Sequence, residues 1–148
     1  MTDRDVARSL VERKRDALGL LEREVDAWVA SAGVDGAPYL MPLSFLWNGE
    51  WLYLSTAVGN PTARNLRANP VVQMTVGGLR DVVHIAGVAD SAQPTAAEAE
   101  AFAIKAGFDP RPLPNYPFIR VRAVTIQAWR EVGELKDRVL MRDGVWLV

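Results

Sequence analysis

Two turn dipeptides near the start of the chain constrain its fold more than any other feature. Asp35-Gly36 and Asn48-Gly49 each interrupt a run rich in β-branched, aromatic and leucine residues. Asp-Gly and Asn-Gly favour the positive backbone angles of a tight turn, so they are the strongest local signal for a β-hairpin. We therefore expect three strands to form an antiparallel meander over residues 26–56.

Two prolines limit where the second of these three strands can lie in a sheet. Pro38 and Pro42 cannot donate to a strand ladder, so this strand should lie partly at a sheet edge or carry a bulge. The rest of the chain alternates between helix-like and strand-like segments. We expect a helical pattern over 3–24 that Gly19 interrupts, a short helix within 57–70, strands at 71–78 and 81–90, a helix opening at Pro94-Thr95, irregular chain at 109–117, a strand at 118–132, and a terminal hairpin at Asp143-Gly144. Six or so mostly antiparallel strands with short helices predict a mainly β fold, a β-barrel with helical additions.

The length of the chain suits one domain. At 148 residues, two independent cores are not expected. We therefore interpret residues 1–148 as a single domain, with an N-terminal helical segment at 1–24, a barrel at 25–132 and a C-terminal hairpin or tail at 133–148. Apolar residues make up 49% of the sequence, which is enough for a packed core.

Composition also excludes several classes of function. Net charge is -1, whereas a nucleic-acid-binding surface normally shows as a basic excess. The sequence has no cysteine and only one histidine, His84, so disulfides, thiolate catalysis and multi-histidine metal sites are not expected. No apolar run approaches the length of a membrane span, and the polar N-terminus does not resemble a signal peptide. We expect a cytoplasmic protein that binds neither nucleic acid nor membranes, and no metal site.

The segment WLYLSTAVGNPTARNLRANP carries the most chemical information. It reads as a strand, a short loop and the start of a helix, whose free N–H groups attract anions. Arg64 and Arg67 are three residues apart, so they can share a helical face, and a guanidinium matches phosphate or carboxylate. The alternative interpretation is a plain surface helix whose arginines pair with acidic side chains.

The order of segments resembles a known family. A hairpin, a strand, LSTAVGNPTARNLRANP, two strands, a helix and a final AWREV strand resemble the pyridoxamine 5'-phosphate oxidase-like split β-barrel family. GAPYLMPLSFLW is similar to the second strand of that family, and ARNLRANP is the most specific stretch. The resemblance covers residues 25–132. It implies an antiparallel, Greek-key-like split β-barrel of the FMN-binding-protein type, in a superfamily of flavin- and deazaflavin-dependent oxidoreductases.

The resemblance also implies a homodimer with two cofactor sites at its interface. In the family, the phosphate sits at the loop and helix after the third strand, the ring lies along the second strand, and a C-terminal strand of the other subunit closes the site. Carried over by position, these are Ser55, Thr56, Asn60, Thr62, Arg64, Asn65 and Arg67 for the phosphate, Pro42, Leu43 and Ser44 for the ring, and Trp129 and Arg130 for the closing strand. Many relatives have lysine where this chain has Thr62, which weakens the phosphate assignment or moves the charge to Arg64 and Arg67.

The choice of cofactor rests on charge. FMN has one phosphate, whereas the deazaflavin F420 adds an acidic oligoglutamate tail for which extra arginines are useful. Fourteen of the seventeen basic residues are arginine, which suggests a GC-rich coding sequence, as in the actinobacteria that make F420. We therefore expect an F420-dependent oxidoreductase that transfers hydride between the cofactor and a small organic substrate. The alternatives are an FMN-dependent reductase or oxidase on the same fold, and a non-catalytic cofactor- or tetrapyrrole-binding protein.

No side chain has to carry the redox chemistry, because the cofactor supplies it. We therefore assign no catalytic residue. Tyr39, Tyr53 and Tyr116 stay open as proton donors, since nothing in the spacing selects one of them. His84 lies in an apolar run, so a place in the core or at a strand edge is the expected one.

Overall fold

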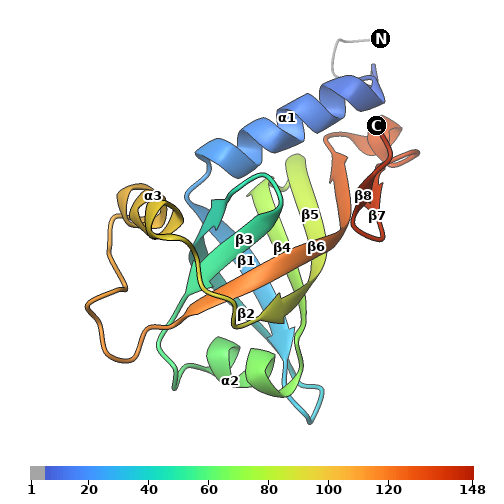
Figure 1. Cartoon of the computed structure of the whole chain (residues 1–148). Helices are drawn as coiled ribbons and strands as arrows, with labels where there is room; N and C mark the ends of the chain where they lie inside the picture. Colours follow the sequence, from blue (N-terminus) through green and yellow to red (C-terminus); the bar gives the residue numbers. More distant parts are fainter. Residues whose placement is uncertain (1–5) are drawn as a thin grey trace.

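The computed structural model describes residues 6–148, and its centre is an antiparallel barrel of six strands (Figure 1). Neighbouring strands follow the order β3-β2-β1-β4-β5-β6, and pairing of β3 with β6 closes the barrel. The six strands are β1 Asp26–Ala32, β2 Pro38–Trp47, β3 Trp51–Ser55, β4 Val71–Gly78, β5 Asp81–Asp90 and β6 Phe118–Trp129. A terminal hairpin of β7 Val139–Arg142 and β8 Val145–Trp146 extends the sheet beyond β6. The mainly β barrel with helical additions is confirmed.

The predicted meander is present, with glycine at both turns. Gly36 has φ +75° and Gly49 has φ +99°, the left-handed region that glycine adopts without steric cost. The edge expected from the prolines is also present. β3 pairs only with the Phe45–Trp47 end of β2, so the half of β2 that contains Pro42 pairs with β1 alone.

Three α-helices lie outside the barrel. They are α1 Leu10–Arg23, α2 Pro61–Ala68 and α3 Ala96–Ala106. Ser9 caps α1 by accepting a hydrogen bond from Glu12 N. The predicted break at Gly19 is wrong, because α1 runs through it and buries Leu20 and Leu21. Residues 3–5 of that predicted segment lie outside the described part of the chain.

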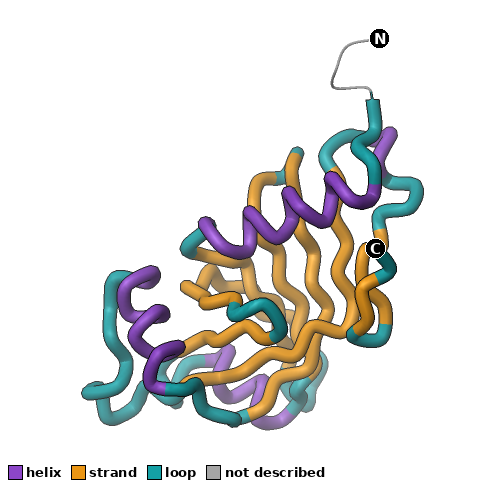
Figure 2. The backbone as a smooth tube through the Cα atoms, turned by 45° about the horizontal axis from the view of Figure 1, so that its top comes forward, coloured by secondary structure: helices purple, strands orange, loops and turns teal. Residues whose placement is uncertain are grey.

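The helices occupy different ends of the barrel. α1 lies across one end and α2 across the opposite end, while α3 packs beside β2 and β3 (Figures 1 and 2). α3 begins with a reciprocal cap in which Thr95 and Glu98 bind each other's backbone N–H. None of the helices within residues 6–148 is long and apolar enough to cross a membrane.

β6 is the longest strand and contains a bulge. Its register with β5 shifts between Ala86 and Gly87, where Val124 has no partner on β5. β6 ends at Trp129, three residues before the predicted end, and a 3₁₀ turn (η2) follows at Val132–Glu134. As a consequence, Arg130 lies beyond the end of the strand ladder.

The barrel interior and the underside of α1 share the main core. Its largest fully buried side chains are Phe45, Leu52, Leu54, Met74, Ile85, Ile126, Leu140 and Leu21. A smaller aromatic cluster under α3 contains Tyr53, Phe102 and Phe118. Phe102 and Phe118 meet edge to face with ring centroids 5.3 Å apart. The rigid barrel therefore positions the loops and helices at its two ends.

Candidate functional site

The loop between β3 and α2 was the centre of the predicted phosphate site. Ser55 and Thr56 are both buried. The Ser55 hydroxyl lies 3.2 Å from the carbonyl oxygen of Tyr116 and 3.1 Å from that of Pro117. Thr56 Oγ1 accepts from Asn60 Nδ2 at 2.9 Å. These hydroxyls therefore fix the loop in the isolated chain.

No side chain of residues 6–148 caps the backbone N–H groups in the first turn of α2. Asn60 is the N-cap residue, but its side chain binds Thr56 and makes no capping bond. Pro61 occupies the first helical position, where its missing N–H costs nothing. Thr62 is only 2% exposed, so it faces the interior rather than the loop surface. What this turn offers an anion is its uncapped amide groups.

Three polar side chains on α2 point in different directions. Arg64 is exposed, and no ion pair of the described residues includes it. Asn65 Nδ2 donates to Ser31 Oγ on β1 at 3.2 Å. Arg67 Nη1 reaches back towards the start of α2 and donates to the carbonyl oxygen of Val58 at 3.0 Å. The two arginines therefore place positive charge near the start of α2.

The predicted ring site on β2 lies on the outer face of the barrel. Pro42 is exposed and lies directly opposite Trp28 of β1. Leu43 is half-buried and packs against the core, and Ser44 Oγ donates to Asp26 Oδ1 at 2.7 Å. Of the three predicted ring contacts, Pro42 is the one with an exposed side chain.

Trp129 and Arg130 lie at the opposite end of the barrel. The first residue of β6, Phe118, pairs with Ser55, whereas Trp129 is its last residue. Phe118 and Trp129 are the two ends of this 12-residue strand, so the steps between them, at about 3.3 Å each, span roughly 36 Å. Arg130 is held there by Asp81 at 3.2 Å and Asp16 at 3.5 Å. One chain does not bring these two residues together with α2.

A row of outward-facing residues crosses the sheet between these two ends. Its members lie directly opposite one another on neighbouring strands: Pro42, Trp28, Thr75, His84 and Gln127. Trp28 is 49% exposed, and Leu40 on the same face is 58% exposed. The alternation of inward and outward residues along each strand could have indicated this outer face. The row itself could not be predicted, because it depends on how the strands pair. Residues Trp28 and Leu40 were not predicted as site residues.

His84 belongs to this row rather than to the core. It lines a cavity of about 540 Å³ together with Trp28 and Trp129, on opposite sides of β5. Its Nε2 lies 2.7 Å from Gln73 Oε1, and burial lowers the pKa of His84 below its usual value. Burial therefore favours the neutral form of this half-buried ring.

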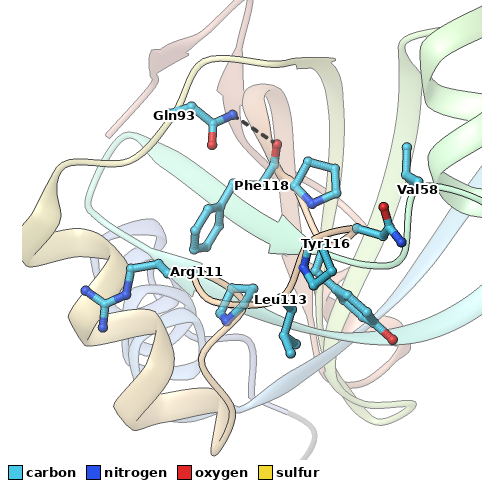
Figure 3. Close-up of a pocket in the computed structure, with 10 residues that line it drawn as sticks. Val58, Gln93, Arg111, Leu113, Tyr116 and Phe118 are labelled. Carbon is cyan, nitrogen blue, oxygen red and sulfur yellow. Dashed lines mark hydrogen bonds between the residues drawn. The ribbon is translucent and has the colours of Figure 1, made fainter.

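The proline-rich loop at 107–117 lies against the β3–α2 loop. Val58 N donates to the carbonyl oxygen of Asn115 at 2.8 Å. Between the two loops is an open pocket of about 480 Å³, whose lining includes Leu113, Tyr116 and Phe118 (Figure 3). Most of the residues that line this pocket belong to the 107–117 loop.

The three tyrosines differ in access. Tyr116 is 37% exposed and lines the pocket of Figure 3. Tyr53 is 4% exposed, and burial raises its pKa. Tyr39 lies near the outer end of β2, with Oη 3.9 Å from Met41 Sδ. Among the described residues, no cluster of three or more potential metal ligands occurs.

Comparison with solved structures supports the same fold. An F420 reductase is 25% identical and has a TM-score of 0.62, with 73% of this chain and 93% of that chain covered. A haem-binding protein from Mycobacterium smegmatis is 17% identical, with a TM-score of 0.71 and coverage of 94% and 60%. The haem storage protein HutZ from Vibrio cholerae is 16% identical, with a TM-score of 0.63 and coverage of 75% and 89%.

Family membership rests on the sequence match. None of the curated proteins matches the chain significantly. The family model described as pyridoxamine 5'-phosphate oxidase matches residues 15–130, which include the whole barrel, α2 and α3. The chain belongs to the pyridoxamine 5'-phosphate oxidase family of split β-barrels.

Proposed function

We propose that this chain is a cytoplasmic, homodimeric oxidoreductase that binds F420 and transfers hydride between the cofactor and a small organic substrate. One observation carries the proposal. Arg64 and Arg67 project from the helix that follows a barrel strand, and neither forms an ion pair with an acidic side chain of the described residues. Uncompensated arginines beside an uncapped helix start suit a ligand with several acid groups.

The donors present fit the acidic part of F420. The cofactor carries a phosphate and a chain of carboxylates. The uncapped first turn of α2 offers backbone amides to the phosphate, while exposed Arg64 and Arg67 offer guanidinium groups to the carboxylates. A lysine at position 62 would lie in the interior, where Thr62 is 2% exposed. The positive charge of the site therefore rests on the two arginines.

A homodimer would complete the site. On the outer face, the apolar side chains of Trp28, Leu40 and Pro42 are left exposed by the described residues 6–148. Large exposed apolar patches usually mark an interaction surface. In a dimer built on this face, Trp129 and Arg130 of one subunit would approach β2 and α2 of the other. This arrangement accounts for the separation of the two halves of the site along β6.

F420, when bound, supplies the hydride chemistry of the reaction. The chain's own residues bind and position it. The buried hydroxyls of Ser55 and Thr56 hold the loop that presents the start of α2. The 107–117 loop lies against the loop that precedes α2 through the hydrogen bond from Val58 N to the carbonyl oxygen of Asn115. FMN on the same scaffold is the alternative cofactor.

Haem carriage is the second candidate function, and one observation favours it. His84, the sole histidine of the sequence, lines a cavity with two tryptophans. A neutral imidazole is a ligand for haem iron, and aromatic walls suit a flat ring. Two solved structures with this fold are described as haem-binding and haem-storage proteins. Here Nε2 would have to leave Gln73 to reach an iron.

Titration with three ligands tests these functions. Quenching of tryptophan fluorescence would be measured with F420 and FMN, and the haem absorption band would be followed on addition of haem. Tight binding of F420 that is lost in Arg64→Gln and retained in Arg142→Gln supports the proposal. Arg142 is an exposed arginine on β7, which makes it a matched control. Preference for FMN moves the chain to the flavin-dependent enzymes, and binding of haem alone, abolished by His84→Ala, favours the carrier.

A further inference from the structure

A groove on the side of α2 that faces β5 and β6 is a separate feature of this end of the barrel. Its volume is about 500 Å³, and its lining is mostly apolar. The walls are formed by Ala63 and Leu66 of α2, Ala89 at the end of β5, and Phe118 and Ile119 at the start of β6. We refer to these residues as the α2 groove. Cavities of this size hold small molecules and enclose most of their surface.

The rim of the α2 groove carries one unbalanced charge. Asp90 lies on the rim, but Arg120 neutralises it through two hydrogen bonds of 2.9 and 2.8 Å. These bonds hold the pKa of Asp90 below its usual value, so the carboxylate stays ionised and paired. Arg67 also lies on the rim, and it donates to the backbone carbonyl oxygen of Val58 rather than to a carboxylate. The net charge that faces the groove is therefore positive.

The groove borders the proposed cofactor site and shares Arg67 with it. Asn65 turns towards Ser31 on β1, whereas Leu66 and Arg67 border the groove at the ends of β5 and β6. Arg64 does not line the groove. The two arginines of α2 can therefore be separated by experiment, since Arg67 borders the groove and Arg64 does not.

We propose that the α2 groove binds an apolar molecule with a single acid group, in the class of medium-chain carboxylic acids. The apolar walls take the hydrocarbon body, which gains free energy when it leaves water. The Arg67 guanidinium already gives one N–H to Val58, and its other N–H donors remain for a carboxylate at the rim. Ser91, also on the rim, is a second polar contact for the acid group. The inference does not depend on which cofactor the chain binds.

Octanoate is a suitable probe, and 1-octanol is its uncharged match. The full chain is titrated calorimetrically with each compound below the concentration at which it forms micelles. We expect saturable binding of octanoate, at least about tenfold weaker binding of 1-octanol, and at least about tenfold weaker octanoate binding by Arg67→Gln. Arg64→Gln should bind octanoate as the unmodified chain does. Equal affinity of the unmodified chain and Arg67→Gln, or equal affinity for octanoate and 1-octanol, would overturn the proposal.

Filling the groove tests the location of binding. Ala89→Leu adds bulk to the wall, and Ser91→Phe adds it at the exposed rim, where folding is less sensitive. Both should weaken octanoate binding, and retained binding by a folded Ser91→Phe variant contradicts the location. Saturating F420 should weaken octanoate binding, because the proposed function gives Arg67 to the carboxylates of F420, whereas saturating FMN, which has no such carboxylates, should leave octanoate affinity unchanged. Displacement by FMN would show one shared site and overturn the inference, whereas failure of both cofactors to bind would count against the proposed function alone.

Discussion

Arg8 holds the carboxylate of Glu134 by both of its oxygens, 126 residues away in the sequence. Arg8 Nη2 lies 2.7 Å from Oε1 and Nε lies 2.9 Å from Oε2. The Arg8 and Arg130 backbone N–H groups also donate to this carboxylate. Arg13, which is 4% exposed, places Nη1 within 3.1–3.3 Å of the carbonyl oxygens of Glu134, Lys136 and Asp137. The segment before α1 is thereby fastened to the turn after β6.

Replacing Glu134 with glutamine should destabilise the fold by about 3 kcal/mol, because it removes a buried carboxylate charge and leaves the half-buried Arg8 with Asp16 as its remaining acidic partner among the described residues. The free energy of unfolding, measured by denaturant titration at pH 7, checks this value. Asp109→Asn is the control, since Asp109 is a carboxylate paired with Arg111 at the exposed loop. An equal loss in both variants would contradict a special role for the buried pair.

The same ion pair predicts how the free energy of unfolding changes at acidic pH. Arg8 lowers the pKa of Glu134 to about 2, against an ordinary value of 4.5. A carboxyl group whose pKa is lower in the folded state contributes stability above the unfolded pKa and loses it as pH falls through the folded one. The difference in unfolding free energy between the unmodified chain and Glu134→Gln should therefore shrink between about pH 5 and pH 2. A pH-independent difference would rule out the ion pair as its cause.

Lys105 should make the free energy of unfolding depend on pH in the alkaline range. Its Nζ lies 3.8 Å from the centroid of the buried Phe45 ring and 3.2 Å from the carbonyl oxygen of Leu21. Burial lowers the pKa of Lys105 to about 8, although nearby acidic groups including Glu24 oppose this shift. The unfolded chain then binds more protons between pH 8 and the ordinary value of 10.5, so stability rises with pH in that window.

The variant Lys105→Met isolates that effect. Methionine keeps an unbranched apolar stem but has no group that titrates. The variant should lose the extra rise in unfolding free energy between about pH 8 and pH 10, while tyrosine and arginine contributions remain common to both chains. Denaturant titrations at several pH values give the two slopes. Parallel slopes would mean that Lys105 titrates normally in the folded chain.

Two adjacent glycines provide a matched test of backbone strain. Gly77 has φ +91°, and a Cβ there would lie 2.3 Å from the carbonyl oxygen of Asp81. Gly78 has no such constraint, and a Cβ there would meet nothing within 4 Å. Gly77→Ala should therefore cost more than about 2 kcal/mol of unfolding free energy, and Gly78→Ala should change it by less than about 1 kcal/mol. Thermal and denaturant unfolding of both variants measures the contrast, and similar losses would contradict it.

Local sequence patterns predicted much of the barrel for identifiable reasons. Gly36 and Gly49 mark turns whose backbone angles depend on nearest neighbours, and Pro42 marks the half of β2 with one partner. The break at Gly19 was wrong because burial of Leu20 and Leu21 against the barrel outweighs the local cost of a helical glycine. Whether the helix continues through Gly19 therefore depends on tertiary packing, which a short stretch of sequence does not reveal.

The candidate site was less predictable, since it depends on contacts between distant segments. Position along the chain identified Arg64 and Arg67, whose side chains are exposed on α2. It could not show that Thr62 points inward, because that depends on how α2 closes the end of the barrel. Nor could it show the distance between Trp129 and the start of α2, which follows from the length and pairing of β6.

That distance leads to a prediction about assembly. If the apolar outer face joins two copies, a charge in its centre should separate them. Trp28→Arg places a cation at a position that is 49% exposed in one chain, so the monomer should still fold. Ile104→Arg is the control, because Ile104 is 75% exposed on α3, away from this face. Light scattering after gel filtration should show a dimer for the unmodified chain and the control, and a monomer for Trp28→Arg. A monomeric unmodified chain at micromolar concentration contradicts the dimer.

Cofactor affinity gives the last prediction. Replacing Arg64 and Arg67 together with alanine should weaken F420 binding by about 2–4 kcal/mol, since each charge-assisted hydrogen bond contributes about 1.5–3 kcal/mol and neighbouring contacts are not additive. The loss should decrease as salt is added, because exposed charges are screened. Arg15→Ala with Arg142→Ala removes the same charge from exposed positions on α1 and β7 and should leave affinity within about 0.5 kcal/mol of the original. Fluorescence titrations at two salt concentrations measure all three chains. Equal losses in both double variants would indicate attraction by net charge alone, and an unchanged affinity in the α2 variant would remove α2 from the cofactor site.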